Sequence, residues 1–378
     1  MVETVLEDRV FAHSMLREIY EQPDAIAATL RHYMLNESLN PEPFKALAEA
    51  LRGHERIVIA ASGSSRHAGL AAEIMLEDLA GLTVDVEYAS EYCYRSTHTL
   101  QSPGVIVVSQ SGETADTLAA LREATARGLS TVAITNHAGS TMAREATASL
   151  PTYAGTEKAI PATKSFTTQL VVLYLTTLYM ARLRGRMTNH AVSSLCEQLV
   201  EVGEALRSAL PEWERQASGF AERMRGASAV LYLGRGIHYA IAREGALKLK
   251  ESAYMQAEGY PAGELKHGPN ALVGKNAPLV VLATRDGNDP DSMLRYEKTL
   301  QLVRDMHTQG AEIFALISED DVEIPLITAN VIRIPRASEY LLSVLEVVPL
   351  QLLAYFSAIL RGIDVDNPRN LVKAVVQE

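Results

Sequence analysis

The chain has 378 residues, which is enough for two domains that each bury a core of their own. Hydrophobic residues make up 47% and charged residues 21%, a globular composition that excludes a disordered chain. With 46 acidic against 35 basic residues the formal charge is −11, which argues against a protein that binds nucleic acid or anionic membranes. A local site can still bind a small anion.

Only two cysteines are present, Cys93 and Cys196, so a disulfide framework and a cysteine-rich metal site are excluded. Residues 1–9 carry acidic side chains and no apolar core, so we expect no signal peptide. The longest apolar stretch, residues 170–183, is shorter than the ~20 residues that span a bilayer and predicts a buried helix. The composition therefore indicates a cytoplasmic protein without a membrane partner.

An N-terminal segment, residues 1–40, contains a helical pattern over residues 18–31 with Pro23 near its start. Residues 41–186 then alternate apolar runs with helical patterns and form the first predicted module. In this module, strands are predicted at 56–61, 104–109 and 131–135, and helices at 67–79, 115–126 and around 168–174.

The same order returns in residues 226–362, after a helical connection over residues 187–225 that contains Trp213. In this second module, strands are predicted at 229–233, 277–283 and 312–317, and helices at 239–257 and around 350–355. The segments 87–91 and 259–264 are also related, and each follows the first helix of its module. The chain is therefore a tandem duplication with an offset of roughly 170–180 residues, followed by a polar tail at 363–378.

Strands that alternate with helices at this spacing are typical of βαβ units. Because the predicted strands are continuously apolar, each module should contain a parallel sheet that is covered by helices on both faces. The predicted fold class is thus α/β, with two tandem modules of three layers. Ligands of such sheets bind beyond the carboxyl ends of the strands, so the turns after the strands are the candidate sites.

One such turn carries three hydroxyl side chains, Ser109, Ser111 and Thr114, together with Gln110. It follows a predicted strand directly and precedes the helix at 115–126. Backbone N–H groups and the positive end of the helix dipole favour an anion there, and the hydroxyls add donors. The turn contains no lysine, so it is not a Walker-type nucleotide site. Taken alone, Ser111 or Thr114 could equally be a helix cap.

The run from Ser109 to Thr117 resembles the phosphate-binding loop of sugar-isomerase (SIS) domains. Further segments resemble the isomerase half of glucosamine-6-phosphate synthase, from about residue 13 to the C-terminus. These segments are 154–157, 162–170, 244–251, 258–269 and 364–373. The resemblance implies two tandem SIS modules, each nucleotide-fold-like, and a hexose or hexosamine 6-phosphate as the ligand.

The resemblance also implies that the phosphate group lies in the hydroxyl-bearing turn and that two serines after the first strand complete the pocket. The expected substrate-binding residues are Ser64, Ser65, Ser109, Gln110, Ser111 and Thr114.

At three places near this pocket the sequence departs from the synthase pattern. Ser62 stands where the synthase usually has cysteine, and Ser64 stands where it usually has threonine. Residues 160–162 replace the usual Val-Ala-Ser, so Ala162 brings no hydroxyl to the sugar. The last change bears on which sugar binds and in which orientation.

Glu251 is the candidate base, and Lys248 lies three residues earlier on the same face of a predicted helix. Periodicity alone would make them a surface ion pair. Moving a carbonyl between C1 and C2 requires a base near both carbons and a cation for the developing oxyanion. The resemblance implies that Glu251 moves the proton and that Lys248 contacts the reacting end of the sugar.

His267 lies in a short turn motif, residues 264–269, and imidazole can accept and return a proton near neutral pH. The resemblance implies that this histidine opens the sugar ring and reaches the site of a neighbouring subunit, so a homodimer is expected. Lys373 lies in the polar tail, and such tails are usually solvated. In the synthase the tail folds over the sugar, and its lysine can form a Schiff base with the open-chain ketose.

Proton transfer by these side chains needs no metal and no organic cofactor. Because the resemblance begins near residue 13, we expect the glutaminase domain of the synthase to be absent, which leaves ammonia-linked chemistry. The predicted function is an isomerising deaminase that converts glucosamine 6-phosphate and water to fructose 6-phosphate and ammonia, or the reverse with free ammonia. Three alternatives stay open. They are a deglycase acting on a fructosamine 6-phosphate, another aldose–ketose isomerase, and a non-catalytic sugar-phosphate sensor, although no DNA-binding motif precedes the modules.

Overall fold

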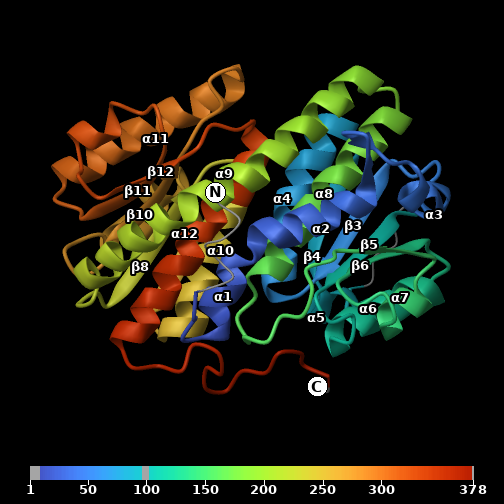
Figure 1. Ribbon diagram of the computed structural model, residues 1–378, viewed down its shortest axis with the longest axis horizontal. Coiled ribbons are helices and arrows are strands. Elements are labelled where there is room, and N and C mark those ends of the chain that lie inside the picture. The colour runs from blue at the N-terminus through green and yellow to red at the C-terminus, as the bar shows by residue number, and fades with distance from the viewer. Residues whose placement is uncertain (1–8, 96–101, 377–378) are drawn as a thin grey trace.

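The computed structural model describes residues 9–95 and 102–376, and Figure 1 shows two lobes that each contain a sheet. The first sheet has the order β4-β3-β5-β6-β7 and the second the order β9-β8-β10-β11-β12. All strand pairs in both sheets are parallel. The two modules therefore share one topology, and the predicted α/β fold of two parallel three-layer modules is confirmed.

The strands of the first sheet are β3 (Arg56–Ala61), β4 (Thr83–Tyr88), β5 (Gly104–Ser109), β6 (Thr131–Thr135) and β7 (Ala148–Pro151). Those of the second are β8 (Ala229–Gly234), β9 (Gln256–Pro261), β10 (Leu279–Ala283), β11 (Ile313–Ser318) and β12 (Val331–Ile334). The N-terminal segment adds a short hairpin of β1 (Met34–Leu35) and β2 (Ser38–Leu39).

The helices of the N-terminal segment and the first module are α1 (Ser14–Tyr20), α2 (Gln22–Tyr33), α3 (Lys45–Ala50), α4 (Gly63–Ala80), α5 (Ala89–Tyr92), α6 (Ala115–Ala126), α7 (Thr141–Glu145) and α8 (Lys164–Leu183). Helix α9 (Asn189–Arg223) connects the modules, and the second module contains α10 (Ile237–Ala253), α11 (Pro290–Thr308) and α12 (Glu339–Leu360). Short 3₁₀ helices include η2 (Glu264–His267).

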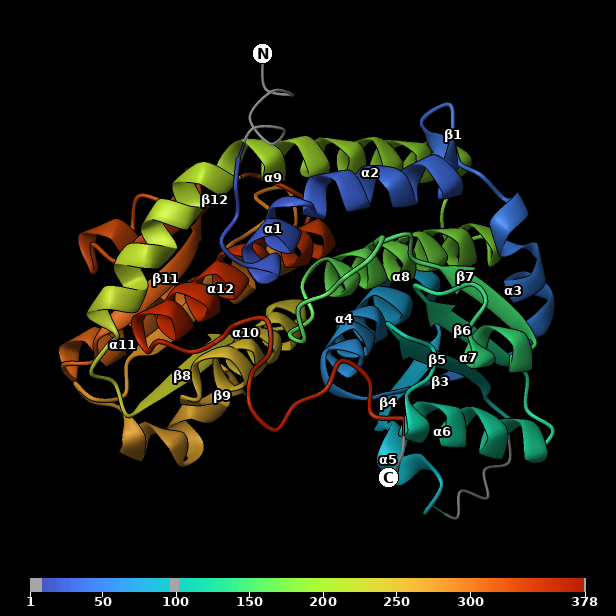
Figure 2. The same ribbon diagram turned by 60° about the horizontal axis from the view of Figure 1, so that its bottom comes forward.

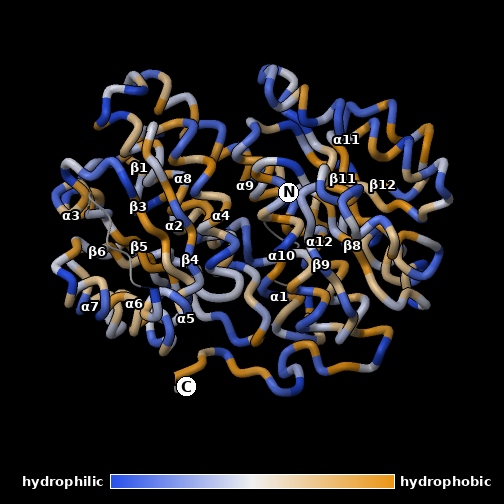
Figure 3. The backbone as a smooth tube through the Cα atoms, turned by 180° about the vertical axis from the view of Figure 1, so that it is seen from behind, coloured by the Kyte–Doolittle hydropathy of each residue, from blue (hydrophilic) through white to orange (hydrophobic). Residues whose placement is uncertain are grey.

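One large apolar core joins the modules, because the inner helices α4, α8, α10 and α12 pack between the two sheets and α9 crosses over them (Figure 1). The outer face of each sheet has a smaller core of its own, under α6 in the first module and under α11 in the second. Figure 3 shows hydrophobic residues along the strands of both sheets. This matches the continuous burial of β5, β6, β10 and β11, as expected for parallel strands covered on both faces.

The six predicted strands are present, but β4, β7, β9 and β12 were not predicted. These four lie at the two edges of each sheet and are only partly buried, so they lack the long apolar run that marks a central strand. The prediction of a helix over residues 239–257 was wrong at the C-terminal end of the helix. It stops at Ala253, Tyr254 adopts a left-handed conformation with φ of 52°, and β9 begins at Gln256 to pair with β8.

The single helix predicted over residues 18–31 is two helices, α1 and α2, which meet at Glu21. The predicted connecting helix is present as α9, and Trp213 on it donates its indole N–H to the carbonyl oxygen of Arg333, at 2.9 Å. The predicted boundaries at 40/41, 186/187 and 225/226 fall between elements, and the one at 362/363 falls after α12. The division into modules at those points stays a prediction. The prediction that the N-terminus is not a signal peptide concerns residues 1–9, of which residues 1–8 lie outside the described residues.

One helix in the described part of the chain, α12, is long and apolar enough to cross a bilayer by length and composition. However, 89% of its apolar window is buried inside the protein, where it packs against α9 and α10. Helix α8, which covers the apolar stretch predicted to be buried, is likewise enclosed. Both helices serve as the inner walls of the core.

The C-terminal tail leaves α12 and runs back to the first module, where its end lies beside α6 (Figure 2). Two backbone hydrogen bonds fasten it there. Ile160 N–H donates to the carbonyl oxygen of Asp366 at 3.0 Å, and Ala115 N–H donates to that of Val375 at 2.9 Å. The tail, which sequence alone would leave solvated, is therefore part of the folded structure.

Candidate functional site

The hydroxyl-bearing turn lies between β5 and α6 and is organised by its own side chains. The Ser109 hydroxyl accepts from the Gly112 N–H at 3.1 Å and lies 3.0 Å from the Thr114 hydroxyl. The Ser111 hydroxyl accepts from the Glu113 N–H at 3.1 Å. Thr114 is the N-terminal cap residue of α6, yet its side chain makes no capping hydrogen bond. The hydroxyls therefore shape the loop, and helix capping does not account for them.

Gly112 is the one position in this turn that requires glycine. Its φ is +67°, and an added Cβ would lie 2.2 Å from the hydroxyl oxygen of Ser140, which caps α7. No other residue can adopt this conformation at this contact without strain. The turn can therefore fold closely against α7 and present its hydroxyls at the carboxyl edge of the sheet.

A cavity of about 290 Å³ opens at this edge, between the turn, the start of α4, helix α10 and the C-terminal tail. Nine of the ten predicted site residues line it. They are Ser64, Ser65, Ser109, Gln110, Ser111, Thr114, Lys248, Glu251 and Lys373. Residues from both modules and from the tail thus meet at one pocket, although they are up to 309 positions apart in sequence (64 to 373).

His267 is the predicted residue that this pocket does not contain. It lies at the end of η2, after the edge strand β9, and its side chain is exposed. A single chain therefore does not bring His267 to the substrate pocket. Its contribution to the pocket of a second copy stays a prediction.

Helix α10 carries a line of charged side chains at the spacing i, i+4, i+7, and the last two of them, Lys248 and Glu251, line the pocket. The Lys248 ammonium lies 2.5 Å from Glu251 Oε2 and 3.4 Å from Glu244 Oε1. The side chains of Lys248 and Glu244 are 1% and 0% exposed, whereas that of Glu251 is 22% exposed. The surface ion pair that periodicity alone suggests is therefore wrong: the lysine is buried, and Glu251 is the carboxylate at the pocket.

Glu244 also links the two modules, because its Oε2 lies 2.8 Å from His67 Nδ1 on α4. Burial raises the pKa of Glu244, but Lys248, His67 and Ser64 outweigh it and keep the pKa below its usual value. Burial lowers the pKa of Lys248, but Glu251 and Glu244 raise it above its usual value. The lysine is thus a fixed cation beside Glu251, as stabilisation of an oxyanion requires.

The tail places Lys373 in the pocket wall through a second buried carboxylate. Its ammonium lies 2.5 Å from Glu157 Oε2 and 2.6 Å from the carbonyl oxygen of Ala159. The side chain of Glu157 is 0% exposed. Sequence reasoning assigned no role to Glu157 or Glu244, although both lie in segments that resemble the synthase. For Glu244, the i, i+4, i+7 spacing with Lys248 and Glu251 was a usable signal.

The positions that depart from the synthase pattern also lie at this pocket. Ser62, Ser64 and Ala162 are all part of its lining. Ser65 is held from behind, because its hydroxyl accepts from Gln169 Nε2 at 3.0 Å. Ala162 therefore leaves the pocket wall without a hydroxyl at a point where the sugar would pass.

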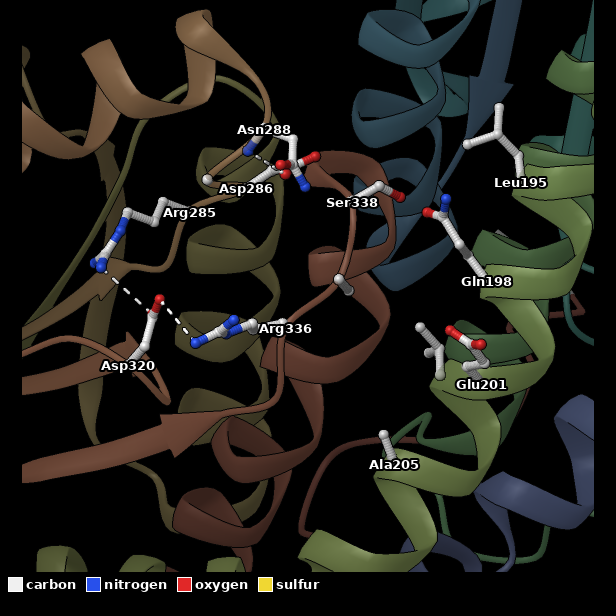
Figure 4. Close-up of a pocket in the computed structure, with 13 residues that line it drawn as sticks. Leu195, Gln198, Glu201, Ala205, Arg285, Asp286, Asn288, Asp320, Arg336 and Ser338 are labelled. Carbon is white, nitrogen blue, oxygen red and sulfur yellow. Dashed lines mark hydrogen bonds and ion pairs between the residues drawn. The ribbon is translucent and has the colours of Figure 1, made fainter. Parts of the chain in front are cut away.

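The second module has a pocket at the same end of its sheet, between α9 and the loop after β10, with a volume of about 570 Å³ (Figure 4). Arg285 and Arg336 both pair with Asp320 there, at 3.3 and 3.4 Å, and Asp286 lies in the loop itself. Carboxylates and paired arginines thus replace the hydroxyls of the first module. The Asp320 carboxylate thus occupies both arginines, and an anion would have to displace it to bind them.

A buried carboxyl behind the Lys373 site predicts a measurable pH effect. Burial raises the pKa of Glu18 to about 7, and the charge of Glu157 adds to the rise. The unfolded value is 4.5, so the folded state holds the extra proton between pH 4.5 and 7, and stability falls as the pH rises through that window. We expect the free energy of unfolding of Glu18→Gln, relative to that of wild type, to rise by about 2 kcal/mol between pH 5 and pH 8. Urea unfolding of both proteins at the two pH values measures this, and parallel pH dependences would contradict it.

A family model for the SIS domain matches residues 50–179 and 223–361, which cover both modules. The chain belongs to the SIS domain family. Within that family it is similar to enzymes named glutamine–fructose-6-phosphate aminotransferase (isomerizing). It is 42% identical to the one from Chlorobaculum tepidum over 99% of this chain and 60% of that protein, and 41% identical to the one from Caldanaerobacter subterraneus over 97% and 59%. The chain thus spans about 60% of the length of these relatives.

Solved structures show the same relation. The C-terminal domain of glucosamine-fructose-6-phosphate aminotransferase from Francisella tularensis matches with a TM-score of 0.87 and 35% identity, over 95% of this chain and 98% of that one. A glucosamine-6-phosphate deaminase from Thermotoga maritima shares the fold, with a TM-score of 0.72 at 24% identity over 96% and 99%. The resemblance to the isomerase half of the synthase, predicted from sequence motifs, is therefore confirmed.

Proposed function

We propose that the pocket binds a hexosamine 6-phosphate and converts glucosamine 6-phosphate and water to fructose 6-phosphate and ammonia. The observation that carries this proposal is that one pocket gathers three parts. These are a hydroxyl-bearing loop at a helix N-terminus, a carboxylate beside a buried ammonium, and a tail lysine. The loop can bind a phosphate, the carboxylate and the ammonium can act on the reacting carbon pair, and the tail lysine can react with a carbonyl.

The phosphate lies in the Ser109–Thr114 turn, where hydroxyls and backbone N–H groups at the start of α6 donate hydrogen bonds. The other end of the sugar then faces α10. Glu251 is the more exposed member of its ion pair, and in the proposed reaction it takes a proton from carbon. Lys248 stays charged beside it and stabilises the oxygen at C1.

The reaction begins when His267 from a second copy of the chain opens the ring by proton transfer to and from the ring oxygen. Glu251 removes the C2 proton of the open-chain aldehyde to give an enolamine and returns a proton to C1. The product is an imine at C2. Either water hydrolyses it directly, or the Lys373 amine displaces ammonia as a Schiff base that water then hydrolyses. Both routes consume one water and release one ammonia.

We propose deamination as the direction of the reaction at this pocket. Neither Cys93 nor Cys196 lines it, so the described residues of the pocket provide no thiol for releasing ammonia from glutamine. Cells hold ammonia at a low concentration, so mass action favours its release from the sugar. We place this reaction in the cytoplasm, in keeping with the acidic, cysteine-poor composition.

A coupled assay with glucosamine, galactosamine and fructosamine 6-phosphates tests the proposal. We expect ammonia release from a hexosamine 6-phosphate with formation of a ketose 6-phosphate in equal amount. Free amino acid from a fructosamine 6-phosphate without ammonia would favour a deglycase instead. Ligand-induced thermal stabilisation without turnover of any of the three sugars would favour a sensor.

A further inference from the structure

We propose that Glu157 is a positioning residue, whose buried carboxylate holds the Lys373 ammonium in the pocket wall and so fixes the C-terminal tail over the substrate. The inference deepens the proposed function, on which the role of Lys373 in the reaction rests. The contact between the two side chains is a property of the fold and can be tested without turnover.

Hydrogen-bond donors surround the carboxylate of Glu157 on both of its oxygens. Its Oε1 accepts from the Thr163 N–H at 2.9 Å and from the Ser165 N–H at 3.0 Å. Its Oε2 accepts from the Ser165 hydroxyl at 2.7 Å and from Lys373 Nζ at 2.5 Å. Because these donors surround a fully buried side chain, the carboxylate cannot move away from this place without leaving several donors unpaired.

The charge of Glu157 needs a cation. Burial raises its pKa, but Lys373 and the hydrogen bonds outweigh burial and lower it, so the group is ionised. Glu18 faces the same loop from α1, where its carboxylate accepts from the Lys158 N–H, and Lys164 is occupied by Glu21 at 2.6 Å. Lys373 is therefore the cation in direct contact with Glu157, and a carboxylate left without it would be a buried unpaired charge.

This contact decides where the end of the tail lies. Lys373 also donates to the carbonyl oxygen of Ala159, and the neighbouring Ile160 N–H donates to Asp366 of the tail. Two residues beyond the lysine, the carbonyl oxygen of Val375 accepts from Ala115, the first residue of α6. The tail thus crosses the pocket between the Glu157 loop and the phosphate-binding turn, with Lys373 as its charged anchor.

The experiment uses the full chain and two readouts. The first is trypsin cleavage after Arg369, which lies exposed in the tail, measured without substrate. The second is borohydride trapping of fructose 6-phosphate on Lys373 as a function of pH, measured by mass spectrometry. The variants are Glu157→Gln, which removes the charge, Glu157→Asp, which keeps it, and Ser165→Ala as a matched control that removes a donor but leaves the carboxylate.

We expect Glu157→Gln to raise the cleavage rate about tenfold, since a charge-assisted hydrogen bond is lost. We also expect the trapped fraction to fall at every pH tested, because Lys373 is then no longer held at the pocket wall by its contact with Glu157. Glu157→Asp should recover part of both effects, and Ser165→Ala should stay within about twofold of wild type in cleavage.

Lys373→Met tests the same contact from the other side and should also open the tail at Arg369. In that background Glu157→Gln should add nothing, because the two side chains act as one pair. Unchanged cleavage in both single variants would overturn the inference. Absence of ammonia release by wild type would overturn the proposed function and leave the tail result standing. If Glu157→Gln alone fails to fold, cleavage of Lys373→Met and Glu157→Asp still decides the matter.

Discussion

Glu251→Gln is expected to lower kcat for ammonia release from glucosamine 6-phosphate by about 10³-fold, because the amide cannot carry the proton between C2 and C1. The substitution keeps the size of the side chain, and the amide oxygen can still contact Lys248, so the pocket should stay intact. Sugar-phosphate binding, measured as ligand-induced thermal stabilisation, should therefore remain within about twofold of wild type. Steady-state kinetics with coupled ammonia detection gives kcat and KM separately.

Ser111→Ala is the matched contrast, since Ser111 belongs to the phosphate-binding turn and lies in the same pocket as Glu251. Removing its hydroxyl should act mainly on KM, the opposite pattern to Glu251→Gln. A Glu251→Gln protein that keeps a tenth or more of the wild-type kcat would show that another group moves the proton. Equal losses of binding and turnover would instead show that Glu251 holds the fold of the pocket.

His238→Leu is expected to have the largest effect on stability, a loss of about 3–5 kcal/mol. His238 is buried on α10, with Nδ1 2.9 Å from Glu346 and Nε2 3.3 Å from Glu339, and both carboxylates are also buried. Burial alone lowers the pKa of this histidine, but the two glutamates raise it to about 10, so the imidazolium compensates their charges. Leucine would leave two buried carboxylates without that cation.

The same cluster sets a pH profile for stability. The folded pKa of His238 exceeds the unfolded value of 6.5, so its contribution is fully present below pH 6.5 and is lost as the pH rises toward 10. Glu339 has a pKa lowered to about 2, mainly because His238 overcomes burial, so its contribution is present above pH 4.5 and is lost toward pH 2. His190→Ala, at an exposed position on α9, is the control and should change stability by less than about 0.5 kcal/mol.

Urea unfolding between pH 5 and 9 measures both proteins against wild type. We expect the wild type to lose stability toward pH 9 and His238→Leu to lack that part of the pH dependence. Equal slopes for the two proteins would contradict the assignment of a charged His238. A His238→Leu protein as stable as the His190→Ala control would show that the contacts of His238 with the two glutamates do not stabilise the fold.

The central strands could be predicted from sequence because burial on both faces leaves a continuous apolar run. β3, β5 and β6 were predicted at their observed bounds for this reason. The edge strands β4 and β9 were missed, since an edge strand is covered on fewer sides and its sequence need not be apolar. Helix α10 was predicted too long, because the turn at Tyr254 depends on pairing of the next residues with β8.

Some parts of the candidate site could likewise be predicted from the sequence, and others could not. The Ser109–Thr114 turn could be found locally, because a strand, a polar turn and a helix start lie together in sequence. Lys373 and Glu251 could be singled out through resemblance, but not their surroundings. The partners of Lys373 lie more than 210 positions away, at Glu157 and Ala159, and no periodicity connects such positions.

The sequence by itself thus determined the duplication, the parallel sheets and the edge at which a ligand binds, because these follow from local patterns of burial and turn chemistry. Only the tertiary structure decided that Lys248 is buried between two carboxylates and that the tail is seated on Glu157. It also decided that His267 lies outside the pocket of its own chain. Burial and charge pairing depend on which distant elements meet in the folded core, and that information is not local in the sequence.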